Sequence, residues 1–383
     1  MKQYRVVPPP IDTLDLGKSP TDVQLLANAL DSEMPCRTHR HPSSGTRGYR
    51  YHQCIANPYL PNVLYTKCEA PSEICGPNLL DHGPDVQFFS DLALTCQGTY
   101  QSCRANVAIS EGSWYFEVKI IKSNEQLNDS RVRIGLSRRE FNVETPVGSD
   151  AYSYGLSGDG NKLHISRPKQ FTTTFKSGDT IGFHVNLPNR TKWQKIQRAR
   201  YVIRYEGQLY HEIKDFVNSK ELDDLLAPRV GANLEPPLDE TIEGSFVKIY
   251  KNGQFQGTLF ENLRDFLPPL SKFDKIHNVE PYNDGMLGYF PTISVARGGT
   301  AKFCLGPEFS FEAPKGTQPL SEAWKEQISD DIVFDLVDQV HFEETDPYNT
   351  LKVQASLPDF AANTQVNRAK IEHLNTKSLE IGL

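Results

Sequence analysis

Short runs of β-branched and aromatic residues follow one another along most of the chain from residue 57 onward, separated by Gly, Asn, Asp, Ser or Pro. Hardly any long helical pattern interrupts this series. Such a density of strand candidates predicts an all-β fold, an antiparallel β-sandwich. The predicted strands lie within VQFFSDLALTCQ, CRANVAI, GSWYFEVKII, RVRIGLSR, KLHISR, GDTIGFHVNL, RYVIRY, SFVKIYKNGQFQGTLF, YFPTISVARGG and AKFCLG.

The clearest local signal is the stretch KIYKNGQFQG. Asn252 and Gly253 separate two alternating runs there. Both residue types tolerate the positive φ angles of a tight two-residue turn. We therefore predict a β-hairpin centred on these two residues.

The run GSWYFEVKI predicts which side chains enter the core. Trp114 and Phe116 alternate with Tyr115 and Glu117, so the two pairs belong to opposite faces of a strand. We expect Trp114 and Phe116 to be structural core residues, because large aromatic side chains are usually buried.

One stretch near the C-terminus, ISDDIVFDLVDQV, follows a helical period instead. Its aliphatic residues share one side of a helix and its aspartates fall on the opposite side. Pro319 and Ser321 offer a start and Pro347 a stop, which predicts an amphipathic helix over 321–344. The apolar stripe consists of Ile328, Ile332, Val333, Leu336, Val337 and Val340.

Two surfaces could receive this stripe. The helix could pack on its own sandwich as a satellite helix. A stripe of aliphatic residues beside a sandwich that is already complete is better suited to a groove on another protein. We therefore predict a partner-docking helix.

The other segments are arranged around the sandwich. Residues 1–55 are rich in Pro, Ser, Arg and His and are predicted to be an N-terminal extension, partly ordered at best, with a basic loop. The sandwich domain is predicted at 56–316, with loop insertions near 122–130 and 188–243 that break the strand rhythm. The docking segment spans 317–345, and a tail covers 346–383.

Two basic stretches, at 36–52 and 190–204, stand out against a net charge of -7. With that balance, bulk electrostatics do not draw the whole molecule to nucleic acid, so any such contact must be local. Local contact with nucleic acid stays open, as does a solvated surface facing the acidic segment 206–243. The candidate nucleic-acid-contacting residues are Arg37, Arg40, Arg47, Arg50, Arg190, Lys192, Lys195 and Arg198.

The cysteines indicate a reducing compartment. Seven cysteines at irregular spacings in a long chain fit reduced thiols of the cytosol or nucleus better than a disulfide framework. No apolar run is long enough for a transmembrane helix, and the N-terminus does not look like a secretion signal. We expect a protein without membrane contact.

No motif indicates an enzyme or a metal site. The chain holds neither G-x-S-x-G nor H-E-x-x-H, and the glycines of GLSGDGN lie between strands, where no helix amides cradle a phosphate. We expect no catalysis, no cofactor and no bound metal. Zinc is an alternative that we do not favour, because the spacing of its candidate ligands matches no standard finger; these are Cys36, His39, His41, His52 and Cys54.

Read in order, SWYFEV, RIGLS, SGDTIGFHV, VKIYKNGQFQG and YFPTIS resemble the strand series of a SPRY domain across residues 112–294. NLLDHGPDVQFFSDLALTCQG, VGSDAYSYG, GDTIGFHVNLP and CLGPEF, the last before an amphipathic helix, narrow the resemblance. Over 58–345 the chain is similar to the SPRY subunit of COMPASS/MLL-type histone H3 lysine-4 methyltransferase complexes, of the yeast Bre-two or animal Ash-two type. This resemblance implies a nuclear, non-catalytic scaffold subunit.

The resemblance also implies a binding surface. In that family, loops at one end of the sandwich take an extended acidic segment of a WD-repeat subunit, of the retinoblastoma-binding or Swd-one type. By motif, Arg133 of RVRIGLS and Pro146 of TPVGSDAYSY belong to this surface, together with Tyr154. Arginine suits the role because its guanidinium grips a carboxylate through two parallel hydrogen bonds.

This surface departs from the animal pattern at two places. Ser149 stands where the animal motif has a tyrosine, and Gly155-Leu156-Ser157 replaces an aromatic and a basic residue. The surface is thus less basic, and we expect Arg138 or Arg139 to compensate.

The resemblance implies three further partners. The C-terminal helix would dock on the helical dimer of a Dpy-thirty-type subunit (Sdc-one in yeast), the chain would support the catalytic SET-domain subunit, and the nucleosome would be the substrate of the complex. A cytosolic SPRY substrate-recognition adaptor, such as a ubiquitin-ligase receptor, is the alternative. It would share the sandwich, but the adaptor-binding helix box or RING module that it normally needs is not visible.

Overall fold

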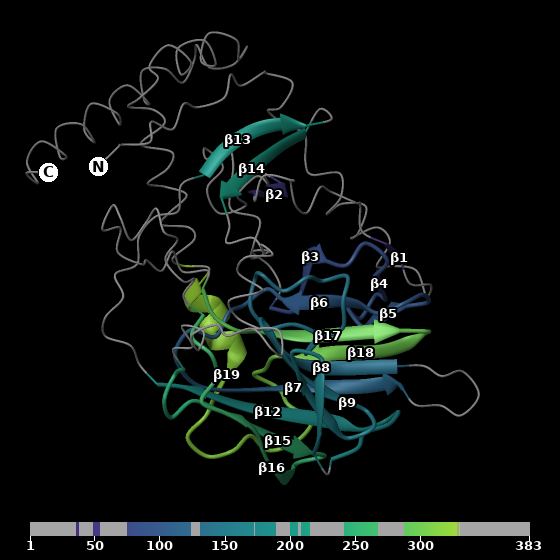
Figure 1. Ribbon diagram of the computed structural model, residues 1–383, viewed down its shortest axis with the longest axis vertical. Coiled ribbons are helices and arrows are strands. Elements are labelled where there is room, and N and C mark those ends of the chain that lie inside the picture. The colour runs from purple at the N-terminus through teal and green to yellow at the C-terminus, as the bar shows by residue number, and fades with distance from the viewer. Residues whose placement is uncertain are drawn as a thin grey trace, which may run out of the picture.

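A computed structural model of the protein describes residues 36–37, 49–53, 75–123, 131–171, 173–188, 200–205, 208–214, 241–266, 287–327 and 329. Two large antiparallel sheets form a sandwich in this part of the chain (Figure 1). The predicted all-β sandwich is therefore confirmed. Among the described residues, no helix has the length and apolar composition to span a membrane.

The first sheet carries the longest strands. Its antiparallel strands follow one another in the spatial order β1 (Cys36–Arg37), β4 (Gln87–Phe88), β5 (Leu94–Cys96), β18 (Gly299–Cys304), β7 (Gly112–Lys122), β12 (Thr180–Leu187), β15 (Phe246–Lys251) and β16 (Gln254–Glu261). The short strand β19 (Gln318–Pro319) also pairs with β7, in parallel orientation.

The second sheet faces the first and carries the candidate site. Its central strand pair joins β8 to β17, with Ile134 opposite Ile293. The spatial order is β11 (Arg167–Gln170), β10 (Asn161–His164), β9 (Ser153–Ser157), β8 (Arg131–Ser137), β17 (Phe290–Ala296), β6 (Gln101–Ala105) and β3 (Pro77–His82).

A third sheet joins two segments that are far apart in the sequence. It consists of β13 (Arg200–Tyr205), β14 (Gln208–Lys214) and β2 (Tyr49–Gln53). The prediction of RYVIRY as a strand is confirmed. The region 188–243 is nevertheless more than a loop insertion, because β14 follows β13 directly and pairs with β2 of the N-terminal extension.

The core lies between the two large sheets. Trp114 and Phe116 are buried in it, as predicted, and the Phe116 ring stacks on Phe183 with ring centroids 4.9 Å apart. Cys96 and Cys103 are buried there as small apolar side chains. Every cysteine described with its side chain, namely Cys75, Cys96, Cys103 and Cys304, is a free thiol.

The outer side of β7 is buried at Tyr115 and Glu117 and exposed farther along the strand. The Glu117 carboxylate accepts hydrogen bonds from the backbone N–H groups of Ser310 at 2.8 Å and Phe311 at 3.2 Å, and from the Tyr115 hydroxyl at 3.2 Å. Segment 305–319 therefore covers this part of the face, so that here residues on both sides of β7 are buried.

The predicted hairpin is confirmed. Asn252 and Gly253 have φ angles of 49° and 77° and connect β15 to β16. Gly158 and Gly160 of GLSGDGN lie in the turn between β9 and β10, as predicted, whereas Gly155 belongs to β9.

The C-terminal helix begins on the sandwich. Residues 320–327 and 329 are helical, Leu320 is fully buried in the core, and Trp324 packs against it. The Ala108 N–H donates a 3.3 Å hydrogen bond to the Gln327 side chain. The first two turns thus pack on their own domain, whereas the predicted apolar stripe of 328–340 lies outside the described residues.

Candidate functional site

The outer face of the second sheet supports the segment that carries Pro146. Along β8, Val132, Ile134 and Leu136 enter the core, so Arg133 and Ser137 belong to the opposite face. Segment 138–152, the connection from β8 to β9, lies against this face. A Cβ atom added to Gly155 of β9 would come within 2.4 Å of the Val147 carbonyl oxygen, so glycine permits this close approach of two backbones.

Hydroxyl groups of the sheet fix the Pro146 region. Ser102 of β6 donates to the Thr145 carbonyl at 2.6 Å, and the Val147 N–H donates to the Ser294 hydroxyl of β17 at 2.8 Å. The Ser102 and Ser294 hydroxyl oxygens are 2.6 Å apart and share a hydrogen bond. Pro146 is therefore held between two residues that are both bonded to the sheet.

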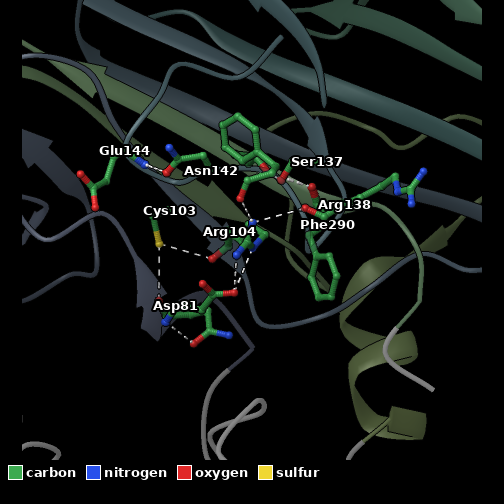
Figure 2. A network of polar contacts seen from close by, with 11 residues as sticks. Asp81, Cys103, Arg104, Ser137, Arg138, Asn142, Glu144 and Phe290 are labelled. Atoms are coloured by element: carbon green, nitrogen blue, oxygen red, sulfur yellow. Dashed lines mark hydrogen bonds and ion pairs between the residues drawn. The ribbon is translucent and has the colours of Figure 1, made fainter. Parts of the chain in front are cut away.

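Arg104 of β6 fixes the start of the same segment. Its Nε and Nη2 atoms donate to one carboxylate oxygen of Asp81 at 3.0 and 2.5 Å. Its Nη1 atom donates to the carbonyl oxygens of Arg138 at 3.3 Å and Phe141 at 3.1 Å. Figure 2 shows Arg104 between Asp81 on β3 and the backbone at Arg138. One buried guanidinium thus ties segment 138–152 to two strands.

Arg138 does not add charge to the surface, which corrects the expectation from the sequence. Its side chain is 2% exposed and donates to both carboxylate oxygens of Glu140, at 2.5 and 3.2 Å. A further bond reaches the Asp265 carbonyl at 2.9 Å. Arg139 is buried as well. The nearby carboxylate of Glu140 neutralises Arg138, so this arginine stabilises the segment from within.

Tyr154 is also a core residue and not a surface contact. It is 5% exposed, its hydroxyl accepts a 3.0 Å hydrogen bond from the Arg264 N–H, and its ring stacks on His164 with centroids 4.3 Å apart. The cause is alternation, because Ser153 and Gly155 occupy the outer positions of β9 and leave Tyr154 on the inner side.

Arg133 lies beside the Pro146 region. Its Cα partners are Ser157 on β9 and Ser294 on β17, and Ser294 is the residue that binds the Val147 N–H. The structure therefore brings together Arg133 and Pro146, the two residues that the family motif singles out.

An aromatic ring supports the Arg133 guanidinium. Its central carbon lies 5.0 Å from the centre of the Tyr100 ring, within the range of a cation–π contact. Arg133 is half-buried, and its Nε atom has no hydrogen-bond partner among the described residues. Burial raises the pKa of Tyr100, and the charges of Arg133 and Arg131 oppose that shift.

A carboxylate stands close to this arginine. The Asp159 carboxylate accepts hydrogen bonds from the Ser157 hydroxyl and, at 3.2 Å, from the Asn161 N–H. Burial alone would raise the pKa of Asp159, but these hydrogen bonds and the Arg133 charge outweigh it, so the pKa is lowered. Asp159 therefore stays ionised at neutral pH.

Tyr100 and Asp159 are candidate site residues that no sequence motif singled out. Tyr100 is 33 positions from Arg133 in the sequence, and only the pairing of β6 with β17 and of β17 with β8 brings them together. Asp159 belongs to the GLSGDGN turn, which was interpreted only as a connection. The signal available was its position two residues after Ser157 in the motif that departs from the animal pattern.

The third sheet brings the two basic stretches together. Ile213 of β14 pairs with Arg50 of β2 on one side and with Arg200 of β13 on the other. Arg37 lies in β1. The other candidate nucleosome contacts lie outside the described residues, namely Arg40, Arg47, Arg190, Lys192, Lys195 and Arg198.

Within the ranges that the structure describes, no three His, Cys, Asp or Glu residues gather as a metal site would require. His39, His41 and Cys54 lie outside these ranges, and Cys36 and His52 lie in strands whose side chains are not described.

Comparison with known proteins places this fold in a family. Residues 113–192 match the SPRY domain family. Two solved SPRY structures, a human SPRY domain and the SPRY domain of human HERC1, align with TM-scores of 0.32 and 0.30 at 15% and 14% identity. The first alignment covers 59% of this chain and 98% of that structure, and the second covers 55% and 87%.

Three fungal proteins are similar over most of the chain. "COMPASS component cclA" of Colletotrichum higginsianum is 34% identical, covering 77% of this chain and 67% of that protein. "Set1 complex component ash2" of Schizosaccharomyces pombe is 41% identical over 82% of this chain and 48% of its own length. "COMPASS component BRE2" of Saccharomyces cerevisiae is 22% identical, with 77% and 86% covered.

The chain is a SPRY-domain protein. It belongs to the family of COMPASS components that includes cclA, ash2 and BRE2. It spans about half the length of the fission-yeast relative.

Proposed function

We propose that this chain is a non-catalytic scaffold subunit of a nuclear COMPASS-type histone H3 lysine-4 methyltransferase complex. The names of its relatives support this function over that of a cytosolic SPRY adaptor. The structural observation that carries the proposal is the position of Arg133 on the Tyr100 ring, beside a Pro146 region that is bonded to two strands. Such a surface is shaped for binding and not for chemistry.

The surface formed by Arg133, Tyr100 and Pro146, called the Arg133 surface below, would hold the WD-repeat subunit. A guanidinium supported by an aromatic ring keeps its planar donors oriented, so it loses little freedom when it binds a carboxylate. Pro146 adds a rigid apolar contact, because the hydrogen bonds at Thr145 and Val147 fix its backbone. This combination suits an extended acidic segment. Holding that segment would favour the active arrangement of the SET-domain subunit by differential binding.

The test of this surface is co-purification with the WD-repeat subunit. Replacing Arg133 by Glu places like charges together, and we expect at least a tenfold loss of affinity, about 1.4 kcal/mol. Arg167→Glu is the matched control, because Arg167 is an exposed arginine of the same sheet, on its edge strand β11. Equal binding of the Arg133 and Arg167 variants would refute the assignment.

The C-terminal helix would dock on the Dpy-thirty-type dimer. The contribution of the described part is anchorage, since Leu320 and Trp324 fix its first turns on the sandwich. The apolar stripe would then continue away from this anchor into a groove of the partner. Replacing Leu336 and Val340 by Glu should abolish co-purification with the dimer and leave the sandwich folded. Replacing Asp331 and Asp338 by Ser on the polar face should leave co-purification with the dimer intact. Loss of binding in both variants would refute the assignment of the apolar stripe as the docking face.

The third sheet would contribute to nucleosome contact. Its pairing supports a shared basic surface, because Arg50 and Arg200 lie across from the same residue of β14. A substitution that removes one phosphate contact should reduce the slope of log affinity against log salt by about 0.9. Combined replacement of Arg50 and Arg200 by Gln should therefore lower that slope for nucleosomes bound by the complex. An unchanged slope would exclude these residues from DNA contact.

A further inference from the structure

We propose that Asp159 is a specificity-determining residue of the Arg133 surface, and that this surface selects a mixed-charge segment, in which a carboxylate meets Arg133 and a cationic side chain meets Asp159. The proposal rests on the function proposed above, because it concerns the same surface. It goes further in naming the chemistry that the bound segment must carry. An acidic segment without a positive charge would be a poorer ligand.

The strand register places the two charges side by side. Ser157 is the Cα partner of Arg133 across the β8–β9 pair, and the Ser157 hydroxyl donates to Asp159. Asp159 also accepts the N–H of Asn161, so its carboxylate is held at the turn directly beyond Ser157. The side chain of Asp159 is exposed. A bound segment that reaches Arg133 therefore passes this carboxylate.

The two charges are close without neutralising each other. Arg133 forms no ion pair with Asp159, whereas Arg104 and Arg138 each have a carboxylate partner at 2.5 Å. Tyr100 supports the guanidinium, and Ser157 and Asn161 hold the carboxylate. Both charges keep capacity for a ligand, because the donors of Arg133 and the acceptors of Asp159 are only partly used.

The consequence for a ligand follows from Coulomb's law. A second carboxylate placed near Asp159 is repelled, and a lysine or arginine at that place is attracted. Exposed charge pairs of this kind change affinity by about two- to fivefold. Asp159 therefore changes which segment is preferred, because it weakens binding of purely acidic ligands as much as it strengthens binding of mixed-charge ones.

The experiment uses the full chain and two fluorescent 12-residue probe peptides. One carries Glu at alternate positions with Gly and Ser between them, and the other carries Glu and Lys in turn at the same positions. Affinities are measured by fluorescence anisotropy at low and high salt. The variants are Asp159→Asn, Arg133→Gln and the control Asp91→Asn. Asp91 is an exposed turn aspartate whose carboxylate also accepts the N–H two residues on.

The proposal predicts opposite changes for the two peptides. Asp159→Asn keeps the turn, because the Asn side-chain oxygen accepts the same hydrogen bonds. It should strengthen binding of the all-acidic peptide by about two- to fivefold and weaken the mixed-charge peptide by a similar factor. High salt should reduce both changes. Asp91→Asn should alter neither affinity.

Two results would overturn the proposal in distinguishable ways. If Arg133→Gln weakens both peptides but Asp159→Asn shifts neither, or shifts both in the same direction, the role of Asp159 is wrong and the Arg133 surface stands. If Arg133→Gln has no effect, or neither peptide binds the unmodified chain, the Arg133 surface itself is wrong and the role of Asp159 falls with it.

Discussion

Arg104 carries a positive charge into a place where its side chain is 1% exposed. A charge so far from water is tolerated only when a counter-charge and hydrogen bonds replace its hydration. Asp81 supplies the counter-charge, and the carbonyl oxygens of Arg138 and Phe141 supply the bonds. At the residue scale, this side chain couples the stability of the fold to the position of the Pro146 segment.

Replacing Arg104 by Met should be strongly destabilising, because Asp81, at 16% exposure, would keep a largely buried negative charge without its partner. We expect a loss of about 3–5 kcal/mol in the free energy of unfolding, measured by urea denaturation. Adding Asp81→Asn should recover part of this loss.

The matched control is Lys302→Met at the exposed ion pair of Lys302 with Asp91, whose charged atoms lie 3.2 Å apart. The free energy of unfolding of this variant should fall by less than about 1 kcal/mol. Comparable losses in the two methionine variants would show that burial of the Arg104 pair has no special weight.

His164 gives the fold a dependence on acid. Burial and, to a smaller degree, the Arg264 charge lower its pKa to about 4, from an ordinary value of 6.5, although a hydrogen bond to the Ser153 carbonyl opposes the shift. The unfolded chain therefore binds a proton more readily between these pH values. This contribution to stability is complete above pH 6.5 and declines as the pH falls toward 4, by about 3 kcal/mol at most.

His164→Gln removes the titrating group and should flatten the profile of unfolding free energy against pH between 6.5 and 4. The other histidines are the same in the unmodified protein and in the variant, so the difference between the two profiles isolates His164. Identical slopes for the two chains would contradict the assignment.

At the scale of elements, sequence patterns predicted the strands with strong apolar or aromatic content and missed those without it. β8, β12 and β17 fall within the predicted runs, and β7 extends one residue beyond its run. β11, with the sequence RPKQ, is exposed throughout and carries no pattern. β2 and β14 escaped because each is stabilised by pairing with a segment more than 150 residues away or with its hairpin neighbour, which local periodicity does not reveal.

The residues of the candidate site were likewise predicted only in part. The family motif predicted Arg133 and Pro146, which lie near each other in the structure; their role in binding stays a prediction. The motif did not reveal that Arg138, Arg139 and Tyr154 are buried, because a motif states which residues occur but not which side of a strand they occupy. Tyr100 joins the site through strand pairing alone.

Gly155 tests how closely segment 138–152 must approach the sheet. Alanine there would bring a Cβ atom within 2.4 Å of the Val147 carbonyl oxygen, so the segment must shift. We expect Gly155→Ala to cost about 1–3 kcal/mol in unfolding free energy and to weaken binding of the WD-repeat subunit.

Gly98→Ala is the control, because a Cβ atom there meets nothing within 4 Å. Its effect should stay within about 0.5 kcal/mol. If Gly155→Ala destabilised the chain but left binding unchanged, the position of the segment would not matter for the partner.

At the scale of the whole molecule, the fold separates three surfaces. The second sheet presents the Arg133 surface, the first sheet and segment 305–319 lead into the C-terminal helix, and the third sheet joins the two basic stretches (Figure 1). A scaffold needs such separate surfaces, because each subunit must bind without displacing another. We propose that together these surfaces support methylation by a different subunit.

The most direct test is the rate of histone H3 lysine-4 methylation on nucleosomes by a reconstituted complex, measured with and without this chain. We predict that the rate falls when the chain is omitted, returns when it is added back, and returns incompletely with Arg133→Glu but fully with Arg167→Glu. Equal rates with and without the chain would refute the scaffold role.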